Sequence, residues 1–390
     1  METDEHNPVY RDPNLLIVFG VTLTAVMGVS SITPAFPKIA EQFGVTPERT
    51  GLLITAYYVP GIVLTPILGF LSDHWGRRPI LGPSLLLFAV AGALCGVAPD
   101  FEVLLVLRFL QGAGAASLAA LNLTIIGDLF EGERRTEAMG YNASVLSVGT
   151  AAYPSIGGAL ALFGWYYPFV LPLLAIPTGL VVLTRLENPE PEGDQALGEY
   201  MREIWSVLQS RQVIGVFILG FVTFVVLFGP YLTYFPILMD ETFGSSSLVI
   251  GLVMSSVSVA SGITAARLGD LSRRFSKRTL LVVAFLLYTA TFAAMPYVGS
   301  IWAMLVPSAT YGIAQGLNIP SLQALLAGIA PMEQRGAFMS FNGLINRVGQ
   351  TLGPVAAGGL YAIWGFEGVY LGAAALTFAT LAPLLFAIRG

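Results

Sequence analysis

Residues 133–160 read ERRTEAMGYNASVLSVGTAAYPSIGGAL, and residues 333–360 read EQRGAFMSFNGLINRVGQTLGPVAAGGL. Aligned without gaps, the two stretches are identical at nine of 28 positions, at an offset of 200 residues. The basic pairs at 77–78 and 277–278 repeat at the same offset. The chain therefore contains two copies of one unit, in the same order along the chain.

The composition places both copies in a membrane. Of the 390 residues, 55% are hydrophobic and 11% are charged, whereas soluble globular proteins carry about 25% charged residues. This deficit excludes a single water-soluble domain, a disordered chain and a nucleic-acid-binding protein. The formal net charge of −5 provides no basic field that would attract polyanions.

Twelve apolar stretches are long enough to span a bilayer, which needs about 20 residues per helix. The runs are continuous rather than alternating, so helices are expected and a β-barrel is excluded. The predicted fold is an all-α integral membrane protein with twelve transmembrane helices in two parallel six-helix repeats. The expected spans are 14–37, 50–71, 80–98, 102–126, 137–162, 165–184, 212–238, 247–266, 279–298, 301–328, 337–363 and 366–388.

The spans divide the chain into four parts, and the first span is expected to be retained as a helix. A polar, proline-containing segment separates the halves, and its second part, 197–210, has the apolar spacing of an interfacial helix. The predicted parts are a cytoplasmic tail at 1–13, a six-helix bundle at 14–184, a cytoplasmic linker at 185–211 and a second six-helix bundle at 212–390.

Charge counting predicts the orientation. With the N-terminus in the cytoplasm, the cytoplasmic segments hold fifteen Lys and Arg residues and the outer segments hold two. This bias agrees with the positive-inside rule. We therefore expect a multi-pass protein of the cell membrane with both termini in the cytoplasm.

The loop after the second span reads GFLSDHWGRR over residues 69–78. It resembles the signature loop of the major facilitator superfamily, G-x-L-x-D-x-x-G-R-R/K. Gly69 is expected to allow close helix approach, Gly76 a tight turn, and Arg77 an ion pair with Asp128 at the end of the fourth span. The resemblance implies a transporter fold with a cytoplasmic gate formed by Gly69, Asp73, Gly76, Arg77, Arg78 and Asp128.

The fourth span contains Arg108, Gln111 and Gly112, which resemble the R-x-x-Q-G motif of the same family. Arg108, Gln111 and Asn122 share one face of a continuous helix. The resemblance implies that Arg108 takes part in proton coupling or responds to substrate. The alternative is that Arg108 extends to the outer interface to reach water.

Two glycine–proline stretches resemble the family's antiporter motif, G-x-x-x-G-P-x-x-G-G. Small residues let helices touch and proline bends a span, so helix packing alone also accounts for them. In the first copy Tyr153 stands where the motif has glycine, which weakens the implied export by exchange. The expected interface residues are Gly149, Pro154, Gly157, Gly158, Gly349, Gly353, Pro354 and Gly358.

The interior of the expected spans holds two arginines, Arg108 and Arg347, and no Asp or Glu. A charge near the midplane needs a partner or water. For Arg347, local groups such as Asn346 could serve, as could a bound anion, because guanidinium binds carboxylate or phosphate in bidentate fashion. The candidate cavity residues are Tyr57, Arg108, Gln111, Asn122, Tyr231, Gln315, Asn318, Asn342, Asn346 and Arg347.

The sequence contains no pattern typical of a metal, cofactor or nucleotide site. Cys95 is the single cysteine, His6 and His74 are the only histidines, and no G-x-x-x-x-G-K-[S/T] occurs. No nucleophile–base pair or mid-span carboxylate pair indicates an enzyme. The expected energy source is therefore an ion gradient, with H+ as the ion.

Three functions remain open. The leading hypothesis is a secondary transporter that moves a small organic solute by alternating access, through proton-coupled efflux of drugs or metabolites. The second is a carrier of an organic or phosphorylated anion held by Arg108 and Arg347. The third is a non-transporting sensor or scaffold with the same fold. The expected partners are a small-molecule substrate and the lipid bilayer, without nucleic acid, and the expected state is a monomer.

Overall fold

The computed structural model describes residues 8–187, 211–329 and 335–387, and all regular structure in these ranges is helical. Within them, ten segments are long and apolar enough to cross a membrane. The chain is therefore an all-helical, multi-pass membrane protein. The helix expected at 197–210 lies outside the described residues.

The helices of the first half are α1 (Pro13–Ser30), α2 (Phe36–Phe43), α3 (Pro47–Trp75), α4 (Arg77–Cys95), α5 (Phe101–Ala115), α6 (Leu118–Leu129), α7 (Gly132–Phe163) and α8 (Ala175–Arg185), with η1 (Val9–Arg11), η2 (Thr33–Ala35) and η3 (Tyr167–Leu174). Those of the second half are α10 (Arg211–Val226), η4 (Leu227–Tyr234), α11 (Phe235–Phe243), α12 (Ser247–Ala266), α13 (Leu268–Arg274), α14 (Lys277–Ala294), η5 (Met295–Tyr297), α15 (Leu305–Ile329), α16 (Arg335–Ala379) and α17 (Leu381–Ala387).

The ten membrane segments differ from the twelve expected spans at two places. The long segment Phe341–Phe386 covers both of the last expected spans, and its backbone leaves helical geometry at Gly365, with φ of +61°. The helix α15 coincides with the expected span at 301–328 but is not among the ten, because polar residues such as Gln315 and Asn318 lower its hydropathy. The number twelve stays a prediction.

Corresponding residues of the two halves end helices in the same way. Gly44 ends α2 and Gly244 ends α11, both in the left-handed region with φ of +60° and +59°, where glycine carries no Cβ penalty. Arg78 donates to the carbonyl oxygen of Leu183 in α8, and Arg278 Nη2 donates to that of Leu385 in α17 at 2.7 Å. Each arginine thus satisfies a carbonyl at a helix C-terminus.

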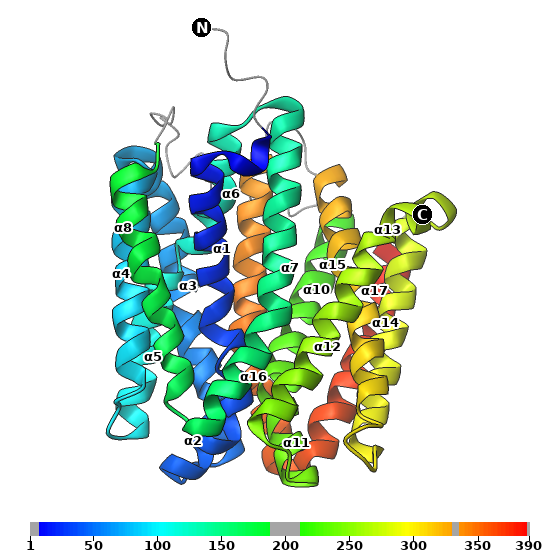
Figure 1. The fold of residues 1–390 in the computed structure, drawn as a ribbon. Helices are drawn as coiled ribbons and strands as arrows, with labels where there is room; N and C mark the ends of the chain where they lie inside the picture. The colour runs from blue at the N-terminus through cyan, green and yellow to red at the C-terminus, as the bar shows by residue number, and fades with distance from the viewer. Residues whose placement is uncertain (1–7, 188–210, 330–334, 388–390) are drawn as a thin grey trace, which may run out of the picture.

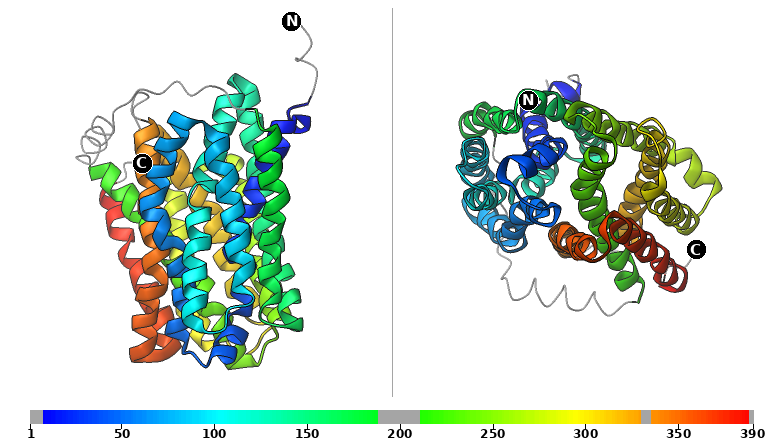
Figure 2. Two further views of the ribbon diagram at one scale, coloured as in Figure 1. Left: turned by 90° about the vertical axis from the view of Figure 1, so that its left-hand side faces the viewer. Right: turned by 90° about the horizontal axis from the view of Figure 1, so that it is seen from below.

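The helices form two groups. Most helices before residue 187 lie at the left of Figure 1 and most after 211 at the right, with α16 seen between α1 and α7, and the view along the helices in Figure 2 separates the same groups. The buried apolar residues form two main clusters. One is built from residues 9–186 together with Phe228 and Ile237, and the other from residues 213–384. Each group thus packs largely around its own core.

Two helix pairs join the groups along their length, α3 with α16 and α7 with α12. At the lower end of Figure 1, α2 also contacts α11. The α7–α12 contact is a backbone contact, because a Cβ at Gly158 would collide with the carbonyl oxygen of Ser247, and one at Gly251 with that of Pro154. Small residues therefore set the spacing between the two groups.

Candidate functional site

The loop between α3 and α4 forms an ion-pair cluster. Gly76 has a φ of +90° and makes the turn, which places Arg77 at the first position of α4. The Arg77 Nε donates to Asp128 Oδ2 of α6 at 3.0 Å, and Nη1 donates to Ser72 Oγ at 2.7 Å and to Asp73. Arg77 is buried between these groups and ties α3, α4 and α6 together.

Two residues of the expected gate take no part in this ion-pair cluster. The expectation that Gly69 allows close helix approach is wrong for this structure, since a Cβ built at Gly69 has no neighbouring atom within 4 Å. Arg78 points to the end of α8 and not to the acids, because the last turn of that helix offers it a free carbonyl. In the second half, Asp270 and Arg273 are exposed and 3.8 Å apart.

Arg108 is buried, with 1% of its surface exposed, and it has acceptors on three sides. Its Nη1 donates to the carbonyl of Gly28 at 2.8 Å and to Gln111 Oε1 at 2.7 Å, and Nε donates to the carbonyl of Leu53 at 3.3 Å. The guanidinium carbon lies 4.5 Å from the centroid of the Tyr57 ring, within range of a cation–π interaction. The alternative that Arg108 reaches the outer interface is wrong, because local groups satisfy it inside the bundle.

The helix of the fourth span has a two-residue break in its hydrogen bonding. α5 ends at Ala115 and α6 begins at Leu118, while Ala116 and Ser117 keep right-handed helical backbone angles. Arg108 and Asn122 both contact α1, because Arg108 donates to the Gly28 carbonyl and Asn122 to Thr22 Oγ1, a hydroxyl that also contacts Asn142 Oδ1 of α7. The break leaves the carbonyl of Ala116 free to accept bonds from outside its own helix.

Arg347 uses that free carbonyl. Its Nη2 donates to the Ala116 oxygen at 3.1 Å, and Thr65 Oγ1 of α3 donates to the same oxygen at 2.8 Å. The side chain passes Gly61 of α3, where a Cβ would collide with Nη1. A guanidinium carries five N–H donors, and this is its one hydrogen bond among the described residues. The bond also joins the two halves of the chain.

The two arginines flank one pair of aromatic side chains. Tyr57 and Tyr58 are close enough to Arg108 and to Arg347 to interact electrostatically with both. The two tyrosine rings are in edge contact, with centroids 5.0 Å apart. The described helices therefore hold two cations around this pair, and the interior of the expected spans contains no Asp or Glu, which occur there only at span ends.

The residues of the glycine–proline motifs lie where helices touch. In α7, a Cβ at Gly157 would collide with the carbonyl of Ser31, and Gly149 faces Leu23. In α16, a Cβ at Gly353 would lie 2.6 Å from the carbonyl of Val225, and one at Gly358 would lie 3.2 Å from the Tyr234 hydroxyl. A Cβ at Gly349 would lie 2.9 Å from the Phe221 carbonyl oxygen. Pro154 and Pro354 lie inside these two helices.

Two of the expected cavity residues in the second half are part of its core. The Tyr231 hydroxyl donates to the carbonyl of Met254 at 3.1 Å, and its ring stacks on Tyr311 at a centroid distance of 4.7 Å. Gln315 Nε2 donates to the Tyr311 hydroxyl at 2.9 Å. Asn318, Asn342 and Asn346 form a separate polar group near α10.

Sequence reasoning missed several partners of these residues. Thr22 and Thr223 hold the amides of Asn122 and Asn318, and their spacing of 201 residues is close to the repeat offset. Thr65 shares the Ala116 carbonyl with Arg347. The segment Leu227–Tyr234 is a π-helix around Pro230, a local distortion that often accompanies function. The Gly-Pro pair at 229–230 is the sequence feature that could have indicated this distortion.

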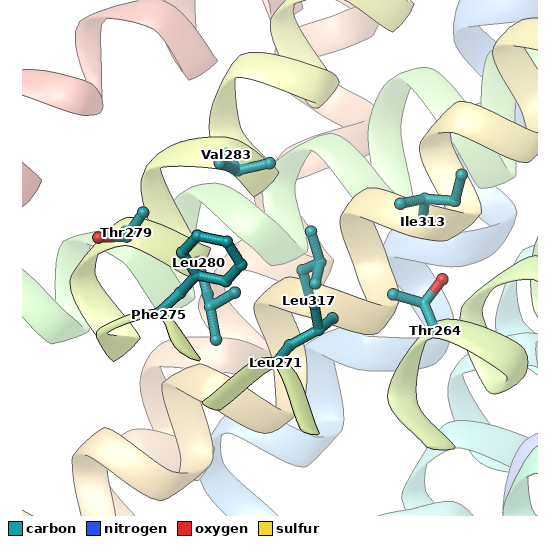
Figure 3. A pocket seen from close by; sticks show the side chains of 8 residues that line it. All are labelled: Thr264, Leu271, Phe275, Thr279, Leu280, Val283, Ile313 and Leu317. Carbon is teal, nitrogen blue, oxygen red and sulfur yellow. The ribbon is translucent and has the colours of Figure 1, made fainter. Parts of the chain in front are cut away.

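A cavity of about 340 Å³ lies among α12, α13, α14 and α15. Figure 3 shows that its walls come mainly from aliphatic side chains of the second half. None of the expected site residues lines it. The lining residues are Thr264, Leu271, Phe275, Thr279, Leu280, Val283, Ile313 and Leu317. Its lining therefore contains no charged residue that could bind an ionic solute.

The chain is similar to known proteins over nearly its whole length. Residues 18–241 and 231–389 match the Major Facilitator Superfamily. The chain belongs to this superfamily. It is 28% identical over 356 residues to the bacillibactin exporter of Bacillus subtilis (strain 168), covering 87% of this chain and 88% of that protein. It is 26% identical over 361 residues to multidrug resistance protein 1 of the same organism, covering 90% and 91%.

Solved structures share the superfamily fold. The nucleoside transporter NupG superimposes with a TM-score of 0.79 at 13% identity, covering 97% of this chain and all of that chain. The human organic anion transporter MFSD10 (TETRAN) gives 0.72 at 19% identity, covering 97% and 100%. At identities of 13% and 19%, the similarity to these structures shows only that the fold is shared. The sequence relatives place it among membrane transporters.

Proposed function

We propose that this superfamily member is a secondary active transporter that exports a small organic solute across the plasma membrane by alternating access, with a proton gradient as the energy source. The arrangement of two helix groups that meet along α3–α16 and α7–α12 supports this proposal. Both termini would be cytoplasmic, α15 and the two arms of α16 would complete twelve spans, and one chain would suffice.

The close backbone contacts between the groups support rocking of one against the other. At the α7–α12 contact, Gly158 and Gly251 lie directly against backbone carbonyls. The α2–α11 contact closes one end, which is the outer end in the proposed orientation. The described arrangement would then be the state closed to the outside, and Arg77 with Asp73 and Asp128 would form the gate at the opposite end.

Proton coupling has a specific requirement in this chain. Carboxylates occur only in loops and at span ends, so a coupling proton would bind an acid such as Asp128 or Asp240.

Proton coupling is tested with purified protein in liposomes that contain a pH dye, to which cationic drugs and organic anions are added with and without a pH gradient. Solute-dependent proton movement is expected, and solute transport without it would exclude proton coupling.

A second candidate is supported by the contrast between the two arginines. Arg108 has three hydrogen bonds and an aromatic face, whereas Arg347 has one hydrogen bond and is partly exposed. A guanidinium with free donors near the bilayer midplane suits an anionic solute, which it can bind in bidentate fashion. We propose Arg347, and not Arg108, as the anion-binding residue of such a carrier.

Uptake into liposomes tests this candidate with two variants. Arg347→Gln should reduce transport of an organic anion by about tenfold or more, because it removes a charge-assisted contact, and should spare a neutral solute. Arg347→Lys keeps the charge but loses the bidentate geometry and should give intermediate rates. Equal transport of anions by all three proteins would exclude the anion role.

A further inference from the structure

The strongest unexplained feature is a group of buried amide oxygens in the second half. The orientation of Asn318 follows from its neighbour. The Thr223 hydroxyl donates to the carbonyl of Leu219 at 2.7 Å, so its oxygen accepts the hydrogen bond from Asn318 Nδ2 at 2.7 Å. Asn318 Oδ1 is then turned away from Thr223, buried, and without a hydrogen-bond partner among the described residues.

Two more amide oxygens point at one place on α10. A Cβ built at Gly220 would lie 3.2 Å from Asn346 Oδ1 and 3.6 Å from Asn342 Oδ1. Both oxygens are buried and lack partners among the described residues. Gly220 and Thr223 are three residues apart, on the same face of a helix, so all three asparagines line one side of α10. Because Gly220 has no side chain, these two oxygens can approach α10 closely.

The first half contains a related cluster with a different hydrogen-bond pattern. Thr22, Asn122 and Asn142 occupy α1, α6 and α7, as Thr223, Asn318 and Asn342 occupy α10, α15 and α16. Asn122 Oδ1, like Asn318 Oδ1, has no partner in the described part of the chain. Asn142 Oδ1 shares the Thr22 hydroxyl proton with the Val18 carbonyl oxygen, which lies 3.0 Å from Thr22 Oγ1, whereas Asn342 Oδ1, 200 residues later, has no donor among the described residues. The halves therefore differ at this position, and also at Asn346, whose counterpart in the first half is Leu146.

We infer that Asn318, Asn342 and Asn346 form a subsite that accepts hydrogen bonds from an uncharged hydroxyl group of the transported solute. A buried polar atom without a partner is unfavourable, so three such oxygens together indicate that a ligand supplies donors. A cation is a poor candidate, because Arg347 follows Asn346 directly in α16. This inference rests on the proposed transport function and adds the chemistry of one part of the solute.

The first test needs no transported solute. Asn342→Leu removes an unsatisfied buried group from the ligand-free protein and should raise its apparent Tm by about 2–4 °C. The matched variant Asn142→Leu removes a satisfied group and should lower the apparent Tm. A fall in Tm for Asn342→Leu comparable to that for Asn142→Leu would mean that Asn342 is structural and would overturn the inference. If Asn142→Leu does not fold, the sign of the Asn342→Leu shift alone decides.

The second test measures binding of four probes to purified protein by calorimetry. The probes are 4-hydroxybenzoate, 4-methoxybenzoate, 4-hydroxybenzamide and 4-methoxybenzamide. The hydroxyl member of each pair should bind about fivefold more tightly, and this preference should disappear in Asn342→Leu and in Gly220→Ala. Equal binding within both pairs, or no binding of any probe, would overturn the subsite.

The same data separate the inference from the anion proposal. Preference for the benzoates over the benzamides reports on Arg347 and should be lost in Arg347→Gln, while preference for hydroxyl over methoxy remains in that variant. If the unsubstituted protein prefers hydroxyl over methoxy but does not prefer the benzoates over the benzamides, the anion carrier is contradicted and the amide subsite stays supported. Loss of the hydroxyl preference in Arg347→Gln would contradict a separate subsite.

Discussion

Arg347 Nη2 of α16 lies 3.1 Å from the carbonyl oxygen of Ala116, at the point where the helix is broken between α5 and α6. This bond connects the two halves of the transporter. It exists because the break frees a carbonyl that a continuous helix would have used for its own hydrogen bonding. The helix break thus supplies the acceptor that Arg347, 231 residues later in the chain, uses for its hydrogen bond.

The position of Arg347 depends on Gly61, where a methyl group would collide with the guanidinium. We expect Gly61→Ala to displace Arg347 from Ala116 and to reduce anion transport by about three- to tenfold, with a stability change within about 1 kcal/mol because the displaced group is the flexible end of a side chain. Paired transport assays and thermal unfolding check this. Gly359→Ala, where a Cβ meets open space in α16, is the control, and an equal effect of both would contradict the prediction.

Arg108 is expected to behave as a structural residue. Arg108→Gln leaves the carbonyls of Gly28 and Leu53 without their donor, at a cost of about 1–3 kcal/mol for each buried group. Thermal unfolding should show a lower Tm, and transport of anionic and neutral solutes should fall together. A variant with unchanged stability and a defect confined to anions would instead place Arg108 in the binding site.

Weakening the cluster of Arg77, Asp73 and Asp128 is expected to shift the equilibrium between conformations with a closed and an open cytoplasmic end. Asp128→Asn weakens the ion pair by which Arg77 of α4 contacts α6. The free energy of unfolding should fall by about 1 kcal/mol, since the carboxylate is partly exposed. We expect transport to fall several-fold. Cysteine accessibility at the cytoplasmic ends of α3 and α6 should increase. A swapped pair, Arg77→Asp with Asp128→Arg, should recover part of the activity if the ion pair itself is what matters.

Backbone packing between α7 and α12 predicts a strong size limit at Gly158. Gly158→Ala places a methyl group against the Ser247 carbonyl and should destabilise the protein by about 1–3 kcal/mol through overpacking. Gly140→Ala on the same helix meets open space and should be neutral or slightly stabilising because alanine favours helix. Thermal unfolding of both variants provides the comparison, and similar Tm values would refute the assigned contact.

Local rules account for several features of this protein. Long apolar runs predict helices because backbone groups in lipid must satisfy one another. The turn at Gly76 and the contact of Arg77 with Asp128 follow from the residue types and their spacing. Other expectations failed for local reasons. Gly69 was assigned a neighbour that is absent, and Arg78 was assigned to the gate although it donates to the carbonyl of Leu183.

The sequence by itself determined that this protein is a helical membrane protein with an internal repeat and two arginines in the interior of its expected spans, because apolar length, charge and residue identity are properties of the chain. Only the tertiary structure decided how those arginines differ. Arg108 lies among carbonyls of its own half, whereas Arg347 reaches across to Ala116. It likewise decided that Asn142 Oδ1 has a partner and that Asn342 Oδ1 has none among the described residues. Hydrogen-bond partners far apart in sequence are set by how helices pack, and helix spacing depends on contacts that no local pattern encodes.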